Sequence, residues 1–476
     1  MFELEEQELE KTKKLIEQTP IPEKIDQYID SGINKGKKRR NALRKRNILI
    51  SFAASFLLIF LVSIRISPVF ASYVSQIPGL DKIVQLVNYD KGLQLAVENE
   101  FMQLIGLSDE HEDLKFTVDG IIIDESRMML FYTIENKGDH QFINLDNFSF
   151  YDEKGEHLKA SLTYEHFIEM DMRKHKTLTG KIDVNLPSVE EIPETITLEA
   201  RLREELSEGK GDNSKSVRVG EEFDYKREMN VLASTWKIQF SIDKSKFQDL
   251  KEEYYLNETV MIEDQSITFN KVTVYPTRIA VEVTYDNNNS KKIFSIDDLR
   301  IVDEKGEEFA AITNGISRRY ISDNTHVFYL QSNYFVKPKE LYLKASRFKA
   351  LEKDKLEVVI NLEEGKITRR PDERIRLDNV GVNQKGDEIV LEFLLKREQP
   401  LDEKYFYDIF NFQYTDSFGN NYDAKGSSFG SFPVNEDGFD QQIFYNVENI
   451  DYLGPIILQI DQYPTKITGD ISIKVK

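Results

Sequence analysis

The sequence predicts a mainly β protein, with three tandem immunoglobulin-like β-sandwiches that follow one transmembrane helix and a short α-helical N-terminal segment. Three observations lead to this prediction: a unit that occurs three times after residue 115, alternation of apolar and polar residues within that unit, and one uncharged apolar run near the N-terminus. The 476 residues include no cysteine, so disulfide scaffolds and cysteine-ligated metal sites are excluded. Hydrophobic residues make up 40%, which is too apolar for a disordered chain.

Strands are predicted wherever the apolar residues recur at every second position. Ile279, Val281, Val283 and Tyr285 alternate with more polar residues, and the same pattern runs through Trp236–Ile242 and Ile389–Leu395. Such alternation is typical of a strand with one buried face.

The repeated unit is visible when the segments are superposed. Copy one reads LKFTVDGIIIDESRMMLFYTIEN and then DNFSFYDEKGEHL; copy two reads SITFNKVTVYPTRIAVEVTYDN and then DDLRIVDEKGEEF; copy three reads RIRLDNVGVNQKGDEIVLEFLL and then FNFQYTDSFGNNY. The turn glycine follows the first strand by 39 residues in copies one and two and by 44 in copy three. We therefore expect three domains of one fold.

Each copy is expected to close on its own last strand, at Trp236, Leu356 and Ile471. The charged, glycine-containing segment 204–230 then reads as a loop inserted into copy one. The predicted boundaries are 1–47 (cytosolic helical segment), 48–64 (transmembrane helix), 65–115 (juxtamembrane amphipathic helices), 116–245, 246–364 and 365–476 (three sandwiches).

The apolar run from Ile48 to Ile64 contains 17 uncharged residues and is expected to cross the membrane once. Positive charge precedes it, so the positive-inside rule predicts a cytosolic N-terminus, extracellular C-terminal domains and contact with membrane lipid. The residues that set this orientation are Lys35, Lys37, Lys38, Arg39, Arg40, Arg44, Lys45 and Arg46. The alternative is a signal peptide cleaved near Val69-Phe70-Ala71.

The 47 residues before this run are too few for a core of their own. A helix is predicted from Phe2 to Gln18, and a second one follows the prolines at 20 and 22. Its apolar stripe consists of Ile25, Tyr28, Ile29 and Ile33. This segment is either a membrane-surface helix or disordered tail, or a peptide that docks on a cytosolic protein.

Two more short amphipathic helices are expected between the membrane and the first sandwich. Their apolar residues keep helical spacing and are not flanked by lysine or arginine, so packing on the first sandwich is favoured over the outer leaflet. These residues are Leu80, Ile83, Val84, Val87, Leu93, Ala96 and Val97.

Catalytic templates are absent from the sequence, so we expect no enzyme, no cofactor and no metal. GxSxG, GxGxxG after a strand, GxxxxGK[ST] and HExxH do not occur. The acidic turns 152–156 and 303–307 have a lysine where a calcium ligand would stand and are interpreted as hairpin turns. Since residues 48–476 carry a net charge of −23, nucleic acid is not expected as a partner.

Several strings resemble a known family. IPEKIDQYIDSGI, the basic stretch, SPVFASYVSQIPGLDKIVQLV, DKGLQLAVENE and TVDGIIIDESRMMLFYTIEN are similar to those of Gram-positive membrane proteins related to anti-sigma factors. Their ectodomain is a domain of unknown function, often followed by a second immunoglobulin-like module. The resemblance covers residues 20–200 best and 230–360 more weakly.

The resemblance implies a negative effector of an extracytoplasmic-function sigma factor. The cytosolic helix would hold the sigma factor at the membrane, the ectodomain would sense the envelope, and cleavage would release it. The sequence lacks the zinc-binding His and Cys residues of the better-understood anti-sigma domain. The alternative is a cell-surface structural or adhesive protein that binds wall polymer or another protein.

Overall fold

The computed structural model describes residues 2–17, 80–164, 171–185, 192–206, 228–247, 249–312, 317–397, 406–431 and 433–476. Helix α1 (Phe2–Glu17) confirms the first helix predicted from the sequence. It belongs to a unit of residues 1–78, separate from a second compact unit that begins at Gly79. The predicted membrane segment 48–64 lies outside the described residues. In the part of the chain that is described, no helix is long and apolar enough to cross a membrane.

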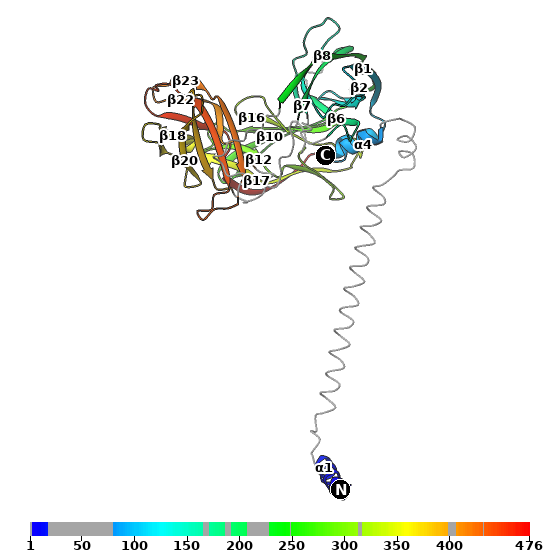
Figure 1. Ribbon diagram of the computed structural model, residues 1–476, viewed down its shortest axis with the longest axis vertical. Coiled ribbons are helices and arrows are strands. Elements are labelled where there is room, and N and C mark those ends of the chain that lie inside the picture. The colour runs from blue at the N-terminus through cyan, green and yellow to red at the C-terminus, as the bar shows by residue number, and fades with distance from the viewer. Residues whose placement is uncertain are drawn as a thin grey trace. The chain divides into compact units, whose positions relative to one another are not determined.

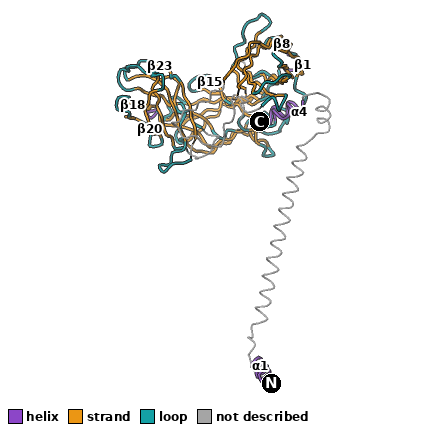
Figure 2. The backbone as a smooth tube through the Cα atoms, in the orientation of Figure 1, coloured by secondary structure: helices purple, strands orange, loops and turns teal. Residues whose placement is uncertain are grey.

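The second unit is mainly β, as expected, and its strands form antiparallel sheets (Figures 1 and 2). Two short helices precede them, α4 (Leu80–Val87) and α5 (Lys91–Glu98). Six sheets are found among the described residues, and we group them into a first, second and third sheet pair in chain order.

The first sheet pair has a sheet of order β1-β2-β3-β6-β5 and a sheet of order β4-β7-β8. Its strands are β1 (Gln103–His111), β2 (Leu114–Ile123), β3 (Met128–Asn136), β4 (Phe142–Tyr151), β5 (Ser161–Tyr164), β6 (Thr177–Asn185), β7 (Thr195–Leu206) and β8 (Glu228–Ser241).

The second sheet pair repeats this arrangement, with orders β9-β10-β11-β16-β15 and β12-β17-β13-β14. Its strands are β9 (Glu252–Ile262), β10 (Gln265–Val274), β11 (Arg278–Tyr285), β12 (Lys291–Ile296), β13 (Arg300–Asp303), β14 (Glu308–Phe309), β15 (Arg318–Tyr320), β16 (Thr325–Gln331) and β17 (Leu341–Glu352).

The third sheet pair has orders β20-β21-β25-β24 and β19-β18-β26-β22-β23. Its strands are β18 (Glu357–Asn361), β19 (Lys366–Arg369), β20 (Ile375–Val382), β21 (Glu388–Leu395), β22 (Phe410–Asp416), β23 (Asn421–Asp423), β24 (Gly426–Ser431), β25 (Gln441–Glu448) and β26 (Ile456–Ile460). The last strand of the chain is β27 (Lys466–Lys474).

The repeat read from the sequence has a counterpart in the backbone. The ladder shifts register after Val118, Phe269 and Leu377, which are equivalent positions of the three copies. Each copy also has the same turn, because Asp152, Asp303 and Asp416 accept backbone N–H groups two and four residues ahead. The glycine of this turn has φ between 81° and 84°, a conformation that glycine adopts without strain. The hairpin-turn interpretation of these segments is confirmed.

Copies two and three do not close on their own last strands, contrary to the expectation. In the first sheet pair, β8 pairs with β7 of the same copy. The equivalent place beside β17 is taken by the C-terminal strand β27. The place beside β26 is taken by β18, which directly follows β17 in the chain. The second and third sheet pairs have therefore exchanged their last strands.

The connection between β17 and β18 is short. Only residues 353–356 join the two strands, and the first three of them form a 3₁₀ turn (Lys353–Lys355). The segment contains none of the glycine or asparagine residues that favour a tight hairpin. The chain continues into the third sheet pair and does not turn back on β17.

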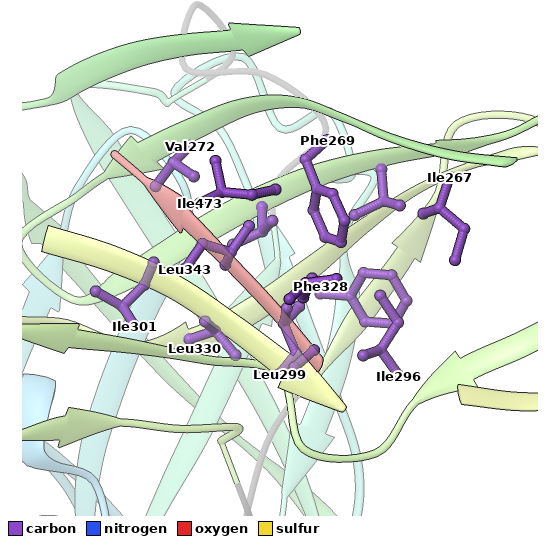
Figure 3. Packing of buried hydrophobic residues seen from close by; sticks show 14 of the residues in the cluster. Ile267, Phe269, Val272, Ile296, Leu299, Ile301, Phe328, Leu330, Leu343 and Ile473 are labelled. Carbon is purple, nitrogen blue, oxygen red and sulfur yellow. The ribbon is translucent and has the colours of Figure 1, made fainter. Parts of the chain in front are cut away.

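Side chains of β27 complete the core of the second sheet pair. Ile467 is fully buried, and Ile471 and Ile473 lie in the same cluster as residues of β10 and β17. Figure 3 shows Ile473 among these side chains, with Val272 and Leu343 nearby. Burial of each such side chain stabilises the fold by about 1.5–3 kcal/mol, so the second core depends on the last residues of the chain.

The predicted loop 204–230 is a strand at both of its ends, which corrects that expectation. Leu206 of β7 pairs with Glu228 of β8, and Glu204 pairs with Asn230. Cross-strand pairing offsets the low strand propensity of the charged residues at these positions. Residues 207–227 lie outside the described chain.

We predict that shortening Ile467 destabilises the second sheet pair although the residue follows the third in sequence. Ile467→Ala should lower the free energy of unfolding by about 2–5 kcal/mol, since it leaves a cavity in a filled core. Hydrogen exchange followed by mass spectrometry should show faster exchange in β17.

The matched control is Ser472→Ala on the exposed face of the same strand, which should change stability by less than about 0.5 kcal/mol. If Ile467→Ala accelerates exchange in β26 but leaves β17 unchanged, the strand exchange is wrong.

Candidate functional site

The interaction residues predicted from the sequence lie outside the described chain. This applies to the stripe Ile25, Tyr28, Ile29 and Ile33 and to the basic residues Lys37, Lys38, Arg39, Arg40, Arg44, Lys45 and Arg46. Among described residues, the most unusual chemistry is a group of buried charges where α5, the first and the second sheet pair meet. We call it the arginine junction; its members are Asp90, Asp124, Ser126, Arg127, Asp183, Thr277 and Arg278.

The helices α4 and α5 bring the chain into this junction. Ile83, Val87, Leu93, Ala96 and Val97 are buried, so the apolar stripes pack on the β region as the sequence favours. The structure adds that α5 also contacts β16 of the second sheet pair.

Contacts at the start of α5 hold it against the second sheet pair. A Cβ atom on Gly92 would lie 2.7 Å from Thr277 O and from Ser332 N, so only glycine permits this approach. Lys91 Nζ donates to Glu308 O at 3.0 Å, and Gln331 Nε2 donates to Tyr89 O at 3.2 Å.

Asp90 has two roles at this place. As the N-cap of α5 it accepts the N–H of Leu93 through Oδ1 at 3.1 Å, which satisfies a free donor of the first turn. Its other oxygen, Oδ2, lies 3.2 Å from Nη2 of Arg127. The start of the helix is thereby tied to the centre of the junction.

Arg127 is the centre of the junction, and its side chain is 0% exposed. Nη1 donates to Asp183 Oδ2 of β6 at 3.1 Å. Nε donates to Thr277 Oγ1 at 3.1 Å, and Nη2 donates to Thr277 O at 2.9 Å. Burial opposes its charge, but the carboxylates of Asp183, Asp90 and Asp124 outweigh this effect and raise its pKa above the ordinary value.

Arg278 is also buried, and it occupies the equivalent position in the second sheet pair. Its Nε donates to Ser126 Oγ at 3.0 Å, and its Nη2 donates to Ser126 O and, at 2.6 Å, to Asn185 Oδ1. The guanidinium lies 3.6 Å from the ring centre of Tyr329, a cation–π distance. Among described residues Arg278 has no ion pair, and its Nη1 has no hydrogen-bond partner. Burial lowers its pKa, and the charge of Arg127 acts in the same direction.

The two arginines bind each other's hairpins reciprocally. Ser126-Arg127 and Thr277-Arg278 occupy the same position of their repeats: Arg127 directly precedes β3, and Arg278 is the first residue of β11. Each arginine donates to the hydroxyl and to the carbonyl oxygen of the residue before the other arginine. Two equivalent hairpins are thus joined by four matching hydrogen bonds.

Asp124 and Glu125 complete the link from the first hairpin. Asp124 Oδ1 accepts the N–H of Ser126 at 2.8 Å, and its Oδ2 accepts the N–H of Thr277 at 2.8 Å. Glu125 pairs with Lys251 at 2.7 Å and accepts the N–H of Asp249, both in the segment between the sheet pairs. Asp124, Ser126 and Arg127 of this hairpin loop therefore contact the second sheet pair, and Glu125 contacts the segment that leads into it.

The arrangement is suited to rigid coupling. Buried, charge-assisted hydrogen bonds fix geometry because a displaced partner leaves an uncompensated charge in a medium of low polarity. Movement of the second sheet pair must therefore move α5 with it or break several bonds at once. In the described part of the chain, no group of three His, Cys, Asp or Glu side chains could hold a metal ion.

The sequence analysis did not single out these arginines, although a signal was present. Both follow a hydroxyl residue at equivalent positions of copies one and two, between two apolar runs. Copy three has Asp387-Glu388 there, so the pattern is confined to copies one and two, which are joined by these arginines.

Comparison with known proteins relates these regions to two families. Residues 43–136 match a family described as a domain of unknown function (DUF4179), and residues 251–377 match a family of unknown function (DUF5643). Asp90, Asp124 and Arg127 lie in the first region, and Thr277 and Arg278 lie in the second.

Comparison with curated proteins finds no match. Among solved structures, a conserved domain protein from Bacillus anthracis is similar at 14% identity and a TM-score of 0.36, over 56% of this chain and 84% of that one.

We predict that the two arginines contribute unequally to stability despite their equivalent positions. Arg127→Met leaves Asp90 and Asp183 buried without their partner and should cost about 3–5 kcal/mol. Arg278→Met removes a buried cation without an ion pair and should cost at least about 2 kcal/mol less. Urea unfolding of both variants tests this difference.

A second measurement separates the junction from general destabilisation. Hydrogen exchange of α5 should accelerate strongly in Arg127→Met, since Asp90 loses its ion pair, and only weakly in Arg278→Met. Equal costs and equal exchange in the two variants would contradict the assignment of Arg127 as the centre.

Proposed function

We propose that this protein is a single-pass membrane regulator with anti-sigma-factor-like action. Its N-terminal segment, in the cytosol, binds an extracytoplasmic-function sigma factor, and its three immunoglobulin-like modules sense the state of the cell envelope. It acts by binding and not by catalysis, and it takes no cofactor. The observation that carries the proposal is the match of residues 43–136 to a domain known in anti-sigma-factor-like proteins.

The position of the match supports a role in transmission. It begins before the apolar run 48–64, includes α5 and ends with β3. Regulation across a membrane requires that a change outside reaches the span. The arginine junction ties α5, on the membrane side of the β region in sequence, to both sheet pairs.

The charge pattern supports the proposed orientation and location in the cell membrane. Residues 31–47 carry 8 basic and no acidic side chains, whereas the chain after residue 47 has a net charge of −23. Basic residues are retained on the cytosolic side during insertion and bind anionic lipid there. The acidic modules remain outside.

The stripe Ile25, Tyr28, Ile29 and Ile33 is the proposed contact with the sigma factor. A short helix alone in water has nothing to bury such a stripe against, so a groove on a partner would stabilise it. Each side chain contributes about 1.5–3 kcal/mol when fully buried, from which the ordering of the helix must be subtracted.

Protease treatment of intact cells tests the orientation. With tags at both ends, external protease should remove the C-terminal tag and leave the N-terminal tag intact until lysis. A C-terminal tag that survives until the cells are broken would contradict the proposal. A C-terminal fragment lacking the N-terminal tag in untreated cells would indicate a cleaved signal peptide.

Capture of the partner tests the regulatory action. The full-length protein in detergent should retain a sigma factor, identified by mass spectrometry. Ile25, Ile29 and Ile33 replaced together by Ser should lower the amount bound at least about tenfold, since three buried side chains are lost.

The matched control replaces Glu23, Asp26 and Asp30, the acidic residues of the same predicted helix, by Ser. This variant should bind as the native chain does. If the native chain retains no sigma factor, or both triple variants lose it equally, the proposed contact is wrong, and a structural or adhesive role is then favoured.

A further inference from the structure

Among the described residues, the third sheet pair lacks an edge strand that the other two possess. In the first and second sheet pairs, the strand before the repeat unit (β1, β9) pairs with β2 or β10 and covers that edge. In the third, β19 holds the same place in the chain but pairs with β18 of the other sheet. Strand β20 is consequently left at the edge of its own sheet.

A pocket of about 300 Å³ lies where these two strands separate. Ile367 and Leu377 contribute apolar surface, and Lys366, Arg369, Arg370 and Arg376 line it with positive charge. Residues 365–377 contain five basic and two acidic side chains, whereas the whole chain has a net charge of −20. The wall of this pocket therefore carries four basic side chains and no acidic one, in an acidic protein.

The arginines are held in place by partners that leave them available. Arg370 Nη1 donates to Ile375 O at 3.0 Å, and Arg376 lies 2.8 Å from Asp437 and 3.3 Å from Asp378. Arg369 pairs with Glu357, and Arg370 also pairs with Glu373.

Two of the acidic partners face water. The side chains of Glu373 and Asp437 are 87% and 62% exposed, and ion pairs in this setting are weak. These carboxylates can turn into solvent when a stronger anion enters. Lys366, on the pocket wall, is exposed and has no ion pair among the described residues.

We propose that this pocket binds a phosphate group carried by an envelope molecule. A ligand with a single carboxylate has two oxygens, which are too few to accept hydrogen bonds from four cationic side chains. A phosphate ester offers more acceptor oxygens to the planar guanidinium groups. The third module would then be the one that binds this ligand. This inference rests on the proposed location of the modules outside the membrane but not on the cytosolic partner, so phosphate binding can hold where the sigma-factor contact fails, and the reverse.

Equilibrium binding of ³²P-labelled pyrophosphate to the full-length protein in neutral detergent tests the site. The variant Arg369→Gln with Arg376→Gln should bind at least tenfold more weakly than the native chain. The control variant, Arg319→Gln with Arg347→Gln, removes the same charge from exposed positions of β15 and β17 and should change binding less than twofold. Thermal unfolding checks that all three proteins are folded.

Two further competition experiments identify the molecule that carries the phosphate and test whether phosphate is preferred over carboxylate. Vesicles of phosphatidylglycerol and a soluble poly(glycerol phosphate) compete with pyrophosphate, and stronger competition by one of them assigns the site to lipid or to polymer. Polyglutamate should compete at least tenfold less well. Absence of binding by the native chain, equal loss in the two double variants, or equal competition by polyglutamate would each overturn the proposal.

Discussion

The organisation of the described chain depends on the hydrogen bonds and ion pairs that the buried guanidinium of Arg127 makes. It contacts the N-cap of α5, β6 of the first sheet pair and the loop before β11 of the second. A charge with no access to water is tolerated only when its partners are held close to it. One residue therefore fixes three separate segments, and α5, one of the two helices between the predicted membrane span and the β region, is part of the same rigid cluster.

The reciprocal contacts and the strand exchange use one repeat unit in two different ways. Copies one and two meet through equivalent hairpins, and the arginine of each hairpin donates a hydrogen bond to a backbone carbonyl of the other. Copies two and three are joined because each completes the other's sheet through β27 and β18. The second sheet pair takes part in both connections. A disturbance in the third module can thus reach α5 through hydrogen-bonded strands and buried charges, without a flexible linker between them.

Local patterns predicted much of this architecture, because strand, turn and helix signals depend on neighbouring residues. The alternation in Ile279–Tyr285 appears as β11, the helix over Phe2–Gln18 appears as α1, and the Asp and Gly residues of the repeated turn have the expected geometry. The stripe of Leu93, Ala96 and Val97 is buried as its spacing indicates. The partner-binding stripe around Ile29 lies outside the described residues and remains a prediction.

The sequence by itself determined the class of fold, the repeat and the charge asymmetry, since these follow from composition and short-range periodicity. Only the tertiary structure decided which strand completes which sheet, which carboxylates neutralise Arg127 and which oxygen atoms accept hydrogen bonds from Arg278. Strand partners are separated by more than a hundred residues in the case of β17 and β27, and pairing over that distance leaves no local pattern. A buried arginine reads in sequence like an exposed one, because its burial is set by the carboxylates and hydroxyls that folding brings around it.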